Sequence, residues 1–437
     1  MNYSTKVKDR LFSIIEEMNS YHWLFTKNPN TDFSRKKKWS FDEIMRFMLS
    51  MEGRSLKDEL LNYFSFDNLT PSNSSFNQRR AQILPEAFEF LFHEFTDSFH
   101  DSFACYKGYR LIACDGSDLC IARNSNDKTT YFETASDSRG FNQLHLNAFY
   151  DLCNRVYVDA VIQPSREENE DRAMCDLIDR YKGSTAIFIA DRNYENYNIF
   201  AHVEEKGMYY LIRVKDINST GILKGITLPE APGFDVWKSI TLTKKQTNEV
   251  KADKEKYKFV PSTSTFDYLD LHVNRFYGLR MRIVRFPIKG DTYECIITNL
   301  PQDRFSTDEI KRLYAKRWGI ETSFRELKYA IGLTRFHSKK TEYIKQEIWA
   351  RMTLYNLCEI ITCAVVVEKN KNRKHTYQVN YTRAIHICQY FLSIKKEKAP
   401  PDVEYLIGHE LLPVRTGRSD PRKVKPQSAV SFLYRTA

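Results

Sequence analysis

The sequence lacks the usual marks of a secreted, membrane-spanning or zinc-binding protein. Its nine cysteines are scattered from Cys105 to Cys388, and no two of them have C-x-x-C spacing, which argues against a zinc site or a redox pair. The first ten residues are polar and charged and contain no apolar signal-peptide core. The most apolar run, Leu354 to Val367, contains Asn356 and Glu359 and is too short to span a bilayer. We therefore expect a cytoplasmic protein with reduced core thiols, a buried helix at 354–367 and no membrane partner.

Length and charge limit the classes to which the chain can belong. Its 437 residues exceed one ordinary core, so we expect about two to four units. Hydrophobic residues make up 42% and charged residues 28%, which is typical of a soluble globular protein. The formal net charge of +10 favours a polyanionic partner, and nucleic acid is the commonest one. The net charge alone is equally consistent with a basic soluble enzyme that does not bind nucleic acid.

The first 104 residues are predicted to be helical. Apolar residues within 41–49 share one helical face, and further short helices are predicted at 56–63 and 75–83. A turn-rich stretch separates the last two, which gives a helix-turn-helix pattern. The last helix carries side chains suited to DNA contact: Gln78, Arg79 and Arg80. We therefore predict a DNA-binding domain at 1–104, although any small helical domain produces this pattern.

Strands and helices alternate from residue 109 onwards. The predicted elements are, in order, strands at 109–122, 144–150 and 155–163, a helix at 168–181, a strand at 185–190, a helix at 197–206 and a strand at 209–214. A turn-like segment after residue 150 predicts that the second and third strands form an antiparallel hairpin. This order matches a ribonuclease-H-like α/β fold. We predict a catalytic domain at 105–365 with a β-rich insertion at 216–298, and a helical segment with a basic tail at 366–437.

Two acids lie at the ends of predicted strands. Asp115 ends the apolar run 111–114 and precedes glycine, and such a pair alone more often marks a turn. Asp191 ends the strand at 185–190, and α/β sheets bind ligands at such carboxyl ends. A helix cap for the following segment is the competing interpretation of Asp191. Neither acid is specific by itself.

A helix predicted at 306–331 carries a third acid. Four of its residues stand at offsets of three, four and seven, which places them within a stripe of roughly 60°: Tyr314, Arg317, Glu321 and Lys328. A solvated face with an i, i+4 ion pair is the competing interpretation. Two strand-end acids and one helix acid can hold two divalent cations, because hard cations such as Mg2+ prefer carboxylate oxygens.

This helix carries a resemblance to a known family. The pattern Tyr314-x-x-Arg317-x-x-x-Glu321-x-x-x-x-x-x-Lys328 resembles the Tyr-Arg-Glu-Lys signature of the hairpin-forming branch of DDE transposases, the insertion sequence four family. The resemblance extends from about Phe33 to the tail.

The two strand-end acids resemble the other two acids of that family. Asp115 in Cys-Asp-Gly-Ser resembles the first acid, and Asp191 in Ala-Asp-Arg-Asn-Tyr resembles the second. Asn193 stands where the family usually has glycine, a departure that leaves the acids in place. The four-residue signature together with both acids in this order is specific, whereas each acid alone is weak.

The resemblance implies a DNA transposase with Asp115, Asp191 and Glu321 as catalytic and metal-binding residues. It implies two Mg2+ ions, with Mn2+ as the alternative metal. A metal-activated water frees a 3′-hydroxyl at the transposon end, the hydroxyl attacks the other strand to close a hairpin, and a second water reopens it before the end joins target DNA. The implied partners are double-stranded DNA, as terminal inverted repeats and as target, and a second copy of the chain in a homodimeric synaptic complex.

The resemblance also implies residues that hold the DNA. Tyr314, Arg317 and Lys328 would bind phosphates and the distorted strand. Trp237 in the insertion is a candidate for stacking on a flipped base, and a core aromatic is an equally good interpretation.

Two other functions share parts of this pattern. A ribonuclease-H-like nuclease without strand transfer shares the acids but does not need the basic helix face. A DNA-binding protein derived from a transposase would not need all three acids, and all three are present here. A glycosidase with paired carboxylates fits the basic charge poorly.

Overall fold

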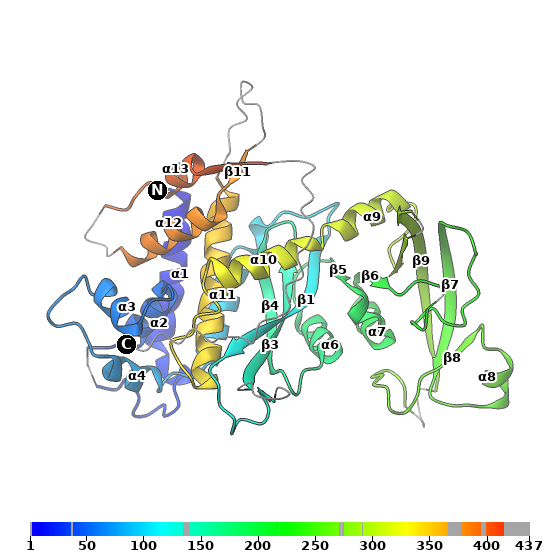
Figure 1. Ribbon diagram of the computed structural model, residues 1–437, viewed down its shortest axis with the longest axis horizontal. Helices are drawn as coiled ribbons and strands as arrows, with labels where there is room; N and C mark the ends of the chain where they lie inside the picture. The colour runs from blue at the N-terminus through cyan, green and yellow to red at the C-terminus, as the bar shows by residue number, and fades with distance from the viewer. Residues whose placement is uncertain are drawn as a thin grey trace.

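The computed structural model describes residues 2–35, 38–133, 140–217, 219–270, 272, 275–290, 292–365, 377–394 and 399–414. Figure 1 shows three regions along the long axis: a helical body, a central sheet with helices on both faces, and a β-rich arm at the opposite end from the helical body. No helix in these ranges is long and apolar enough to cross a membrane.

The helical body is built from both ends of the chain. Its N-terminal elements are α1 (Tyr3–Ser20), η1 (His22–Phe25), α2 (Phe41–Ser50), α3 (Leu56–Tyr63), α4 (Asn73–Arg80), α5 (Glu86–Asp97) and η2 (His100–Ser102). Its C-terminal elements are α11 (Thr341–Cys363), β11 (Tyr377–Val379), α12 (Tyr381–Ser393), α13 (Val403–His409) and β12 (Leu411–Pro413). Serine hydroxyls accept hydrogen bonds from backbone amides and so begin α2, α3 and α4: Ser40, Ser55 and Ser72.

Helix α11 joins the two ends in one core. Most of its side chains are buried, and α1, α2 and α5 pack directly against it. The predicted boundary at residue 104 therefore does not separate two hydrophobic cores. Residues 354–363 of the predicted buried helix form the last turns of α11, and residues 366 and 367 lie outside the described part of the chain. The predicted basic tail beyond residue 414 lies outside the described residues.

A mixed sheet forms the centre. Its first elements are β1 (Arg110–Ile121), β2 (Tyr131–Phe132), β3 (Phe141–Asp151), β4 (Val156–Pro164), α6 (Glu170–Arg180), β5 (Ala186–Ala190), η3 (Arg192–Tyr194), α7 (Tyr197–Glu205) and β6 (Tyr209–Val214). Strand β3 is antiparallel to both β1 and β4, whereas β1, β5 and β6 run parallel. The predicted hairpin is confirmed as β3 and β4, which turn at residues 152–155.

The predicted β-rich insertion extends this same sheet. Its elements are β7 (Phe234–Thr243), α8 (Asn248–Ala252), β8 (Tyr257–Phe259), β9 (Tyr277–Lys289) and β10 (Thr292–Thr298). Because β10 pairs with β6, the strand order continues as β3-β1-β5-β6-β10-β9-β7-β8. The insertion is therefore fixed to the core through backbone hydrogen bonds.

The helix predicted at 306–331 is interrupted. It consists of α9 (Thr307–Ala315) and α10 (Trp318–Tyr329), joined at Lys316 and Arg317, whose amides bond to carbonyls three residues back. Gly332 follows α10 with a φ of 90°, a conformation that favours glycine. Helices α6 and α7 cover one face of the sheet, whereas α9 and α10 cover the other.

Candidate functional site

Asp115 and Asp191 lie side by side on two parallel strands. Ala113 pairs with Ile189, so continuing the register by two residues brings the two acids to the same level. Adjacent strands are about 4.8 Å apart, and side chains alternate between the faces. Both acids therefore share the face of Ala113 and Ile189, which is the face that α9 and α10 cover.

The structure confirms the cap interpretation of Asp191. Its carboxylate accepts a hydrogen bond of 2.8 Å from the Asn193 amide and begins η3. This bond uses one carboxylate oxygen and fixes the side chain at the end of β5. The cap role and a place in the site are therefore compatible.

Arg317 connects Asp115 to Glu321. One guanidinium nitrogen lies 3.4 Å from Asp115 Oδ2, and the other lies 2.6 Å from Glu321 Oε1. Arg317 is the N-cap of α10, and Glu321 lies in the first turn. The break between α9 and α10 thus places the guanidinium between a strand acid and a helix acid.

Asp115 lies within electrostatic reach of both other acids. Burial raises the pKa of Asp115 to about 6; the Arg317 guanidinium opposes this rise, whereas the charges of Asp191 and Glu321 add to it. Like charges held together in a partly buried place are stabilised by a cation. All three donors are carboxylate oxygens, the ligands that Mg2+ and Mn2+ prefer. The donor set is therefore of the kind that divalent ions bind, although the Arg317 guanidinium lies between Asp115 and Glu321 in this structure.

The rest of the predicted signature lies next to these acids. The Tyr314 ring centre is 5.9 Å from the Arg317 guanidinium carbon. Neither the Tyr314 hydroxyl nor Arg317 Nε has a well-formed hydrogen bond within the described part of the chain, and both atoms are buried. Lys328 lies two turns beyond Glu321 and donates a bond of 2.7 Å to the backbone carbonyl of Asp118 on β1.

Trp237 lies apart from the three acids. It is half-buried on β7, with the Arg280 guanidinium 4.8 Å from its ring centre. Strand β7 is five strands from β1, which corresponds to roughly 24 Å. The structure therefore does not bring Trp237 close to Asp115. Because Trp237 is partly exposed, it is not a core aromatic residue.

The positions of Arg79 and Arg80 correct the expectation that both contact DNA. Arg79 is 8% exposed and donates to the Trp39 carbonyl, whereas Arg80 is 0% exposed. Arg80 lies 2.9 Å from Glu347 on α11 and also donates to Gln346. Both guanidinium groups are used inside the helical body, and only Gln78 of the predicted set is exposed.

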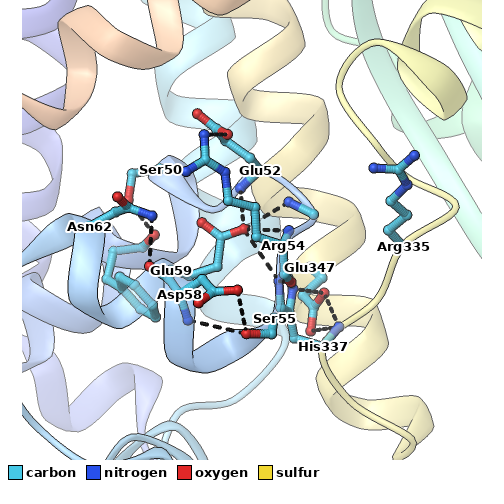
Figure 2. Close-up of polar contacts among 12 residues, drawn as sticks. Ser50, Glu52, Arg54, Ser55, Asp58, Glu59, Asn62, Arg335, His337 and Glu347 are labelled. Atoms are coloured by element: carbon cyan, nitrogen blue, oxygen red, sulfur yellow. Dashed lines mark hydrogen bonds and ion pairs between the residues drawn. The ribbon is translucent and has the colours of Figure 1, made fainter. Parts of the chain in front are cut away.

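Glu59 on α3 and Glu347 on α11 belong to a network of polar contacts, which Figure 2 shows. Glu59 accepts hydrogen bonds from three successive backbone amides, at residues 52 to 54. His337, which follows α10, lies 3.2 Å from Glu347 and 3.7 Å from Glu59. The N-terminal helices are therefore connected through buried charges to the segment between α10 and α11.

We expect Arg80→Met to destabilise the fold rather than to weaken DNA contact directly. The substitution keeps much of the side-chain volume but leaves Glu347 with less compensation, and removing one partner of a buried pair costs about 3–5 kcal/mol. Chemical unfolding of the full chain measures this loss. Gln78→Ala is the matched surface control, with an expected change within about 0.5 kcal/mol. An Arg80→Met protein of unchanged stability that binds DNA poorly would return Arg80 to a DNA-contact role.

The structure brings together one further cluster that sequence reasoning missed. Asp118, His145 and Glu168 place one ligand atom each within 4.8 Å of one another. They lie 27 and 23 residues apart in the chain, so only the β1–β3 register and the segment before α6 bring them together. No short-range spacing could have revealed this cluster.

The fold and site define an α/β protein with a carboxylate centre suited to divalent cations. The family model described as transposase DDE domain matches residues 106–357. This match spans more than half of the chain, and the chain belongs to that family. The predicted resemblance to DDE transposases is thereby confirmed.

Two individual proteins are similar to the chain. Transposase InsG for insertion sequence element IS4 of Escherichia coli (strain K12) is 33% identical over 78 residues, which are 17% of this chain and 18% of that protein. The chain thus matches less than a fifth of this relative's length. The relative's element, IS4, is in line with the predicted resemblance to the insertion sequence four family. A cryo-EM structure of the piggyBac transposase synaptic complex with hairpin DNA is similar with a TM-score of 0.46 and 12% identity, covering 97% of this chain and 88% of that chain.

Proposed function

We propose that the chain is a DNA transposase that performs cut-and-paste transposition by metal-dependent strand cleavage, hairpin formation and strand transfer. The observation that carries this proposal is the convergence of three acids. Asp115 and Asp191 come at the same level of two neighbouring parallel strands, and Arg317 links Asp115 to Glu321. These acids are the proposed catalytic and metal-binding residues, with two Mg2+ ions, or Mn2+ in their place.

The order of elements supports a ribonuclease-H-like core for this function. Three antiparallel strands, β4, β3 and β1, are followed by a helix, β5, a helix and β6. The strands that carry Asp115 and Asp191 are adjacent and parallel, so their ends form one site. In this proposal β7 to β10 are the insertion into that core.

The residues divide the chemistry between them. Bound divalent ions would supply the charge that activates an attacking oxygen and stabilises the leaving oxygen of a phosphodiester. Asp115 and Asp191 present carboxylates from the rigid sheet edge. Glu321 presents a third carboxylate from the first turn of α10. Arg317, whose guanidinium already faces two of these acids, would turn its remaining donors to a phosphate of the strand.

Two further residues would hold the strand on either side. Tyr314 lies beside Arg317, with its ring centre 5.9 Å from the guanidinium carbon, and would support the guanidinium that binds the strand. Lys328 would supply a second cation about two helical turns away. Trp237, partly exposed on the same sheet side as Asp235 and the start of α9, would stack against a flipped base farther along the DNA.

The proposed partners are the element's terminal inverted repeats, target DNA and a second copy of the chain. The net charge of +10 favours these polyanions. We assign repeat recognition to the helical body as a whole, because the helices at 1–104 share their core with α11. Exposed Gln78 on α4 is its first residue to test.

The test uses the full chain and a plasmid that carries the DNA ends flanking its gene. With Mg2+, we expect nicks at the ends, hairpin ends on the excised fragment and joining to a second plasmid. Denaturing gels separate the nicked and hairpin products, and sequencing of junctions detects joining. Nicking without hairpins or joined products would identify a nuclease instead. Binding without any cleavage, in Mg2+ or Mn2+, would identify a DNA-binding protein.

A further inference from the structure

A second group of ligand atoms lies on the opposite face of β1 from Asp115. Side chains alternate along a strand, so Asp118 points to the face covered by α6. Asp118 pairs in register with His145 on β3, and Glu168 and Glu170 approach from the start of α6. Three residues along β1 correspond to roughly 10 Å, so this group is separate from the proposed catalytic acids.

The imidazole of His145 stands at the centre of this group. Its Nδ1 lies 2.8 Å from Asp118 Oδ1 and 3.2 Å from Glu168 Oε2. Its Nε2 lies 3.1 Å from Glu170 Oε1. His145 itself is 6% exposed, whereas Asp118 and Glu168 are open to solvent on one side. One ring nitrogen thus faces two carboxylates at an accessible edge, and the other faces a third carboxylate.

This arrangement is compatible with a metal-binding histidine and its outer partner. Such a histidine typically donates its distal N–H to a carboxylate, which fixes the tautomer and aims the other nitrogen at the metal. Glu170 occupies the outer position. The three prospective ligand atoms lie within 4.8 Å of one another, which is compatible with metal–ligand distances of about 2.0–2.2 Å.

Gly116 makes room for the pair formed by His145 and Glu170. A Cβ at this position would lie 2.3 Å from His145 Nε2 and 2.4 Å from Glu170 Oε1. Any other residue would therefore displace the ring or its outer carboxylate. The close approach of His145 and Glu170 therefore explains why a glycine stands next to Asp115, the first proposed catalytic acid.

Charge balance also favours a cation. Asp118, Glu168 and Glu170 carry three negative charges around one imidazole. Lys328, which donates to the Asp118 carbonyl, places a single ammonium beside these three carboxylates.

We propose that Asp118, His145 and Glu168 form a second divalent-metal site, with Glu170 orienting the histidine. One imidazole nitrogen with two carboxylates suits Mn2+ or Zn2+ better than Mg2+, which prefers oxygen ligands alone. An ion there ties β1, β3 and the start of α6 together, where Lys328 contacts the Asp118 carbonyl. This inference does not depend on the proposed transposition activity.

The experiment counts ions in a full-length protein whose catalytic acids are replaced. In the Asp115→Asn, Asp191→Asn, Glu321→Gln triple variant, we expect Mn2+ titration followed by electron paramagnetic resonance to show one remaining site per chain, with nitrogen coupling from the imidazole. Zn2+ should compete for it. Adding Glu170→Gln should weaken binding about 10–100-fold, and adding His145→Gln or Glu168→Gln should abolish the site.

Glu167→Gln is the matched control, because it removes one exposed negative charge beside Glu168 and no ligand. Its Mn2+ affinity should equal that of the triple variant. Circular dichroism shows whether each protein is folded, and the exposed Glu168 keeps the test informative if His145 variants unfold. A folded triple variant that binds neither ion would overturn the proposal and leave His145 as an imidazolium held by carboxylates. A site that survives Glu168→Gln and His145→Gln would overturn it as well.

Discussion

Asp115→Asn, Asp191→Asn and Glu321→Gln are each expected to abolish Mg2+-dependent cleavage of an element-end duplex. Each substitution keeps the side-chain shape but removes a negative ligand from the carboxylate centre. Metal stabilisation of the developing charge is worth several kcal/mol, so the loss corresponds to a rate reduction on the order of a thousandfold or more. The assay follows nicked product from a labelled duplex over time.

Binding to the same duplex should persist in all three variants, because repeat recognition is assigned to the helical body. Gel shifts under non-cleaving conditions measure this. Asp308→Asn is the matched control: it removes an exposed acid from the first turn of α9 without touching the three acids, and should cleave like the parent. Any variant of the three that cuts at near the parental rate would remove that residue from the proposed catalytic set.

Asp115 and Asp191 could be predicted because the signal for each lies in the residues directly before it. Each follows a short apolar run, and parallel strands bring such ends together at one sheet edge. The helix break could not be predicted in the same way. The residues from Leu313 to Trp318 include neither glycine nor proline, and Gly319 comes just after the break. Gly319 lets α10 lie close to the β3–β4 turn, since a Cβ at this position would lie 2.9 Å from Leu152.

Buried charges explain the other differences. Arginines at the end of a short polar helix are usually exposed, and α4 gave no apolar signal to the contrary. The partner of Arg80 is Glu347, 267 residues later on α11. Likewise His145 meets Asp118 only through the β1–β3 register. Pairings at such separations follow from the complete fold and leave no periodic pattern in the sequence.

Arg317→Ala and Lys328→Ala are expected to retain some first-strand nicking but to lose hairpin product disproportionately. Nicking requires the acids, their ions and water at one phosphodiester. Hairpin closure also requires the second strand to bend sharply into the site, which brings phosphates together and needs fixed cations on a rigid element. Arg317 and Lys328 provide these cations on one side of α10, against β1.

Conservative variants separate charge from geometry at this helix. Arg317→Lys keeps the charge but loses the planar fork that spans Asp115 and Glu321, so it should resemble Arg317→Ala in hairpin yield more than the parent. Tyr314→Phe keeps the ring and should be milder. Lys316→Ala is the matched control, since it removes an exposed cation beside Arg317.

A denaturing gel of a labelled element-end duplex scores nicked and hairpin bands over time for each variant. The ratio of the two bands is the decisive quantity, because a general loss of DNA binding lowers both equally. Equal loss in Arg317→Ala and Lys328→Ala would assign this face to binding alone. A selective loss of the hairpin band would show that the cations beside Glu321 act on the second strand, after the first cut and before the ends are joined.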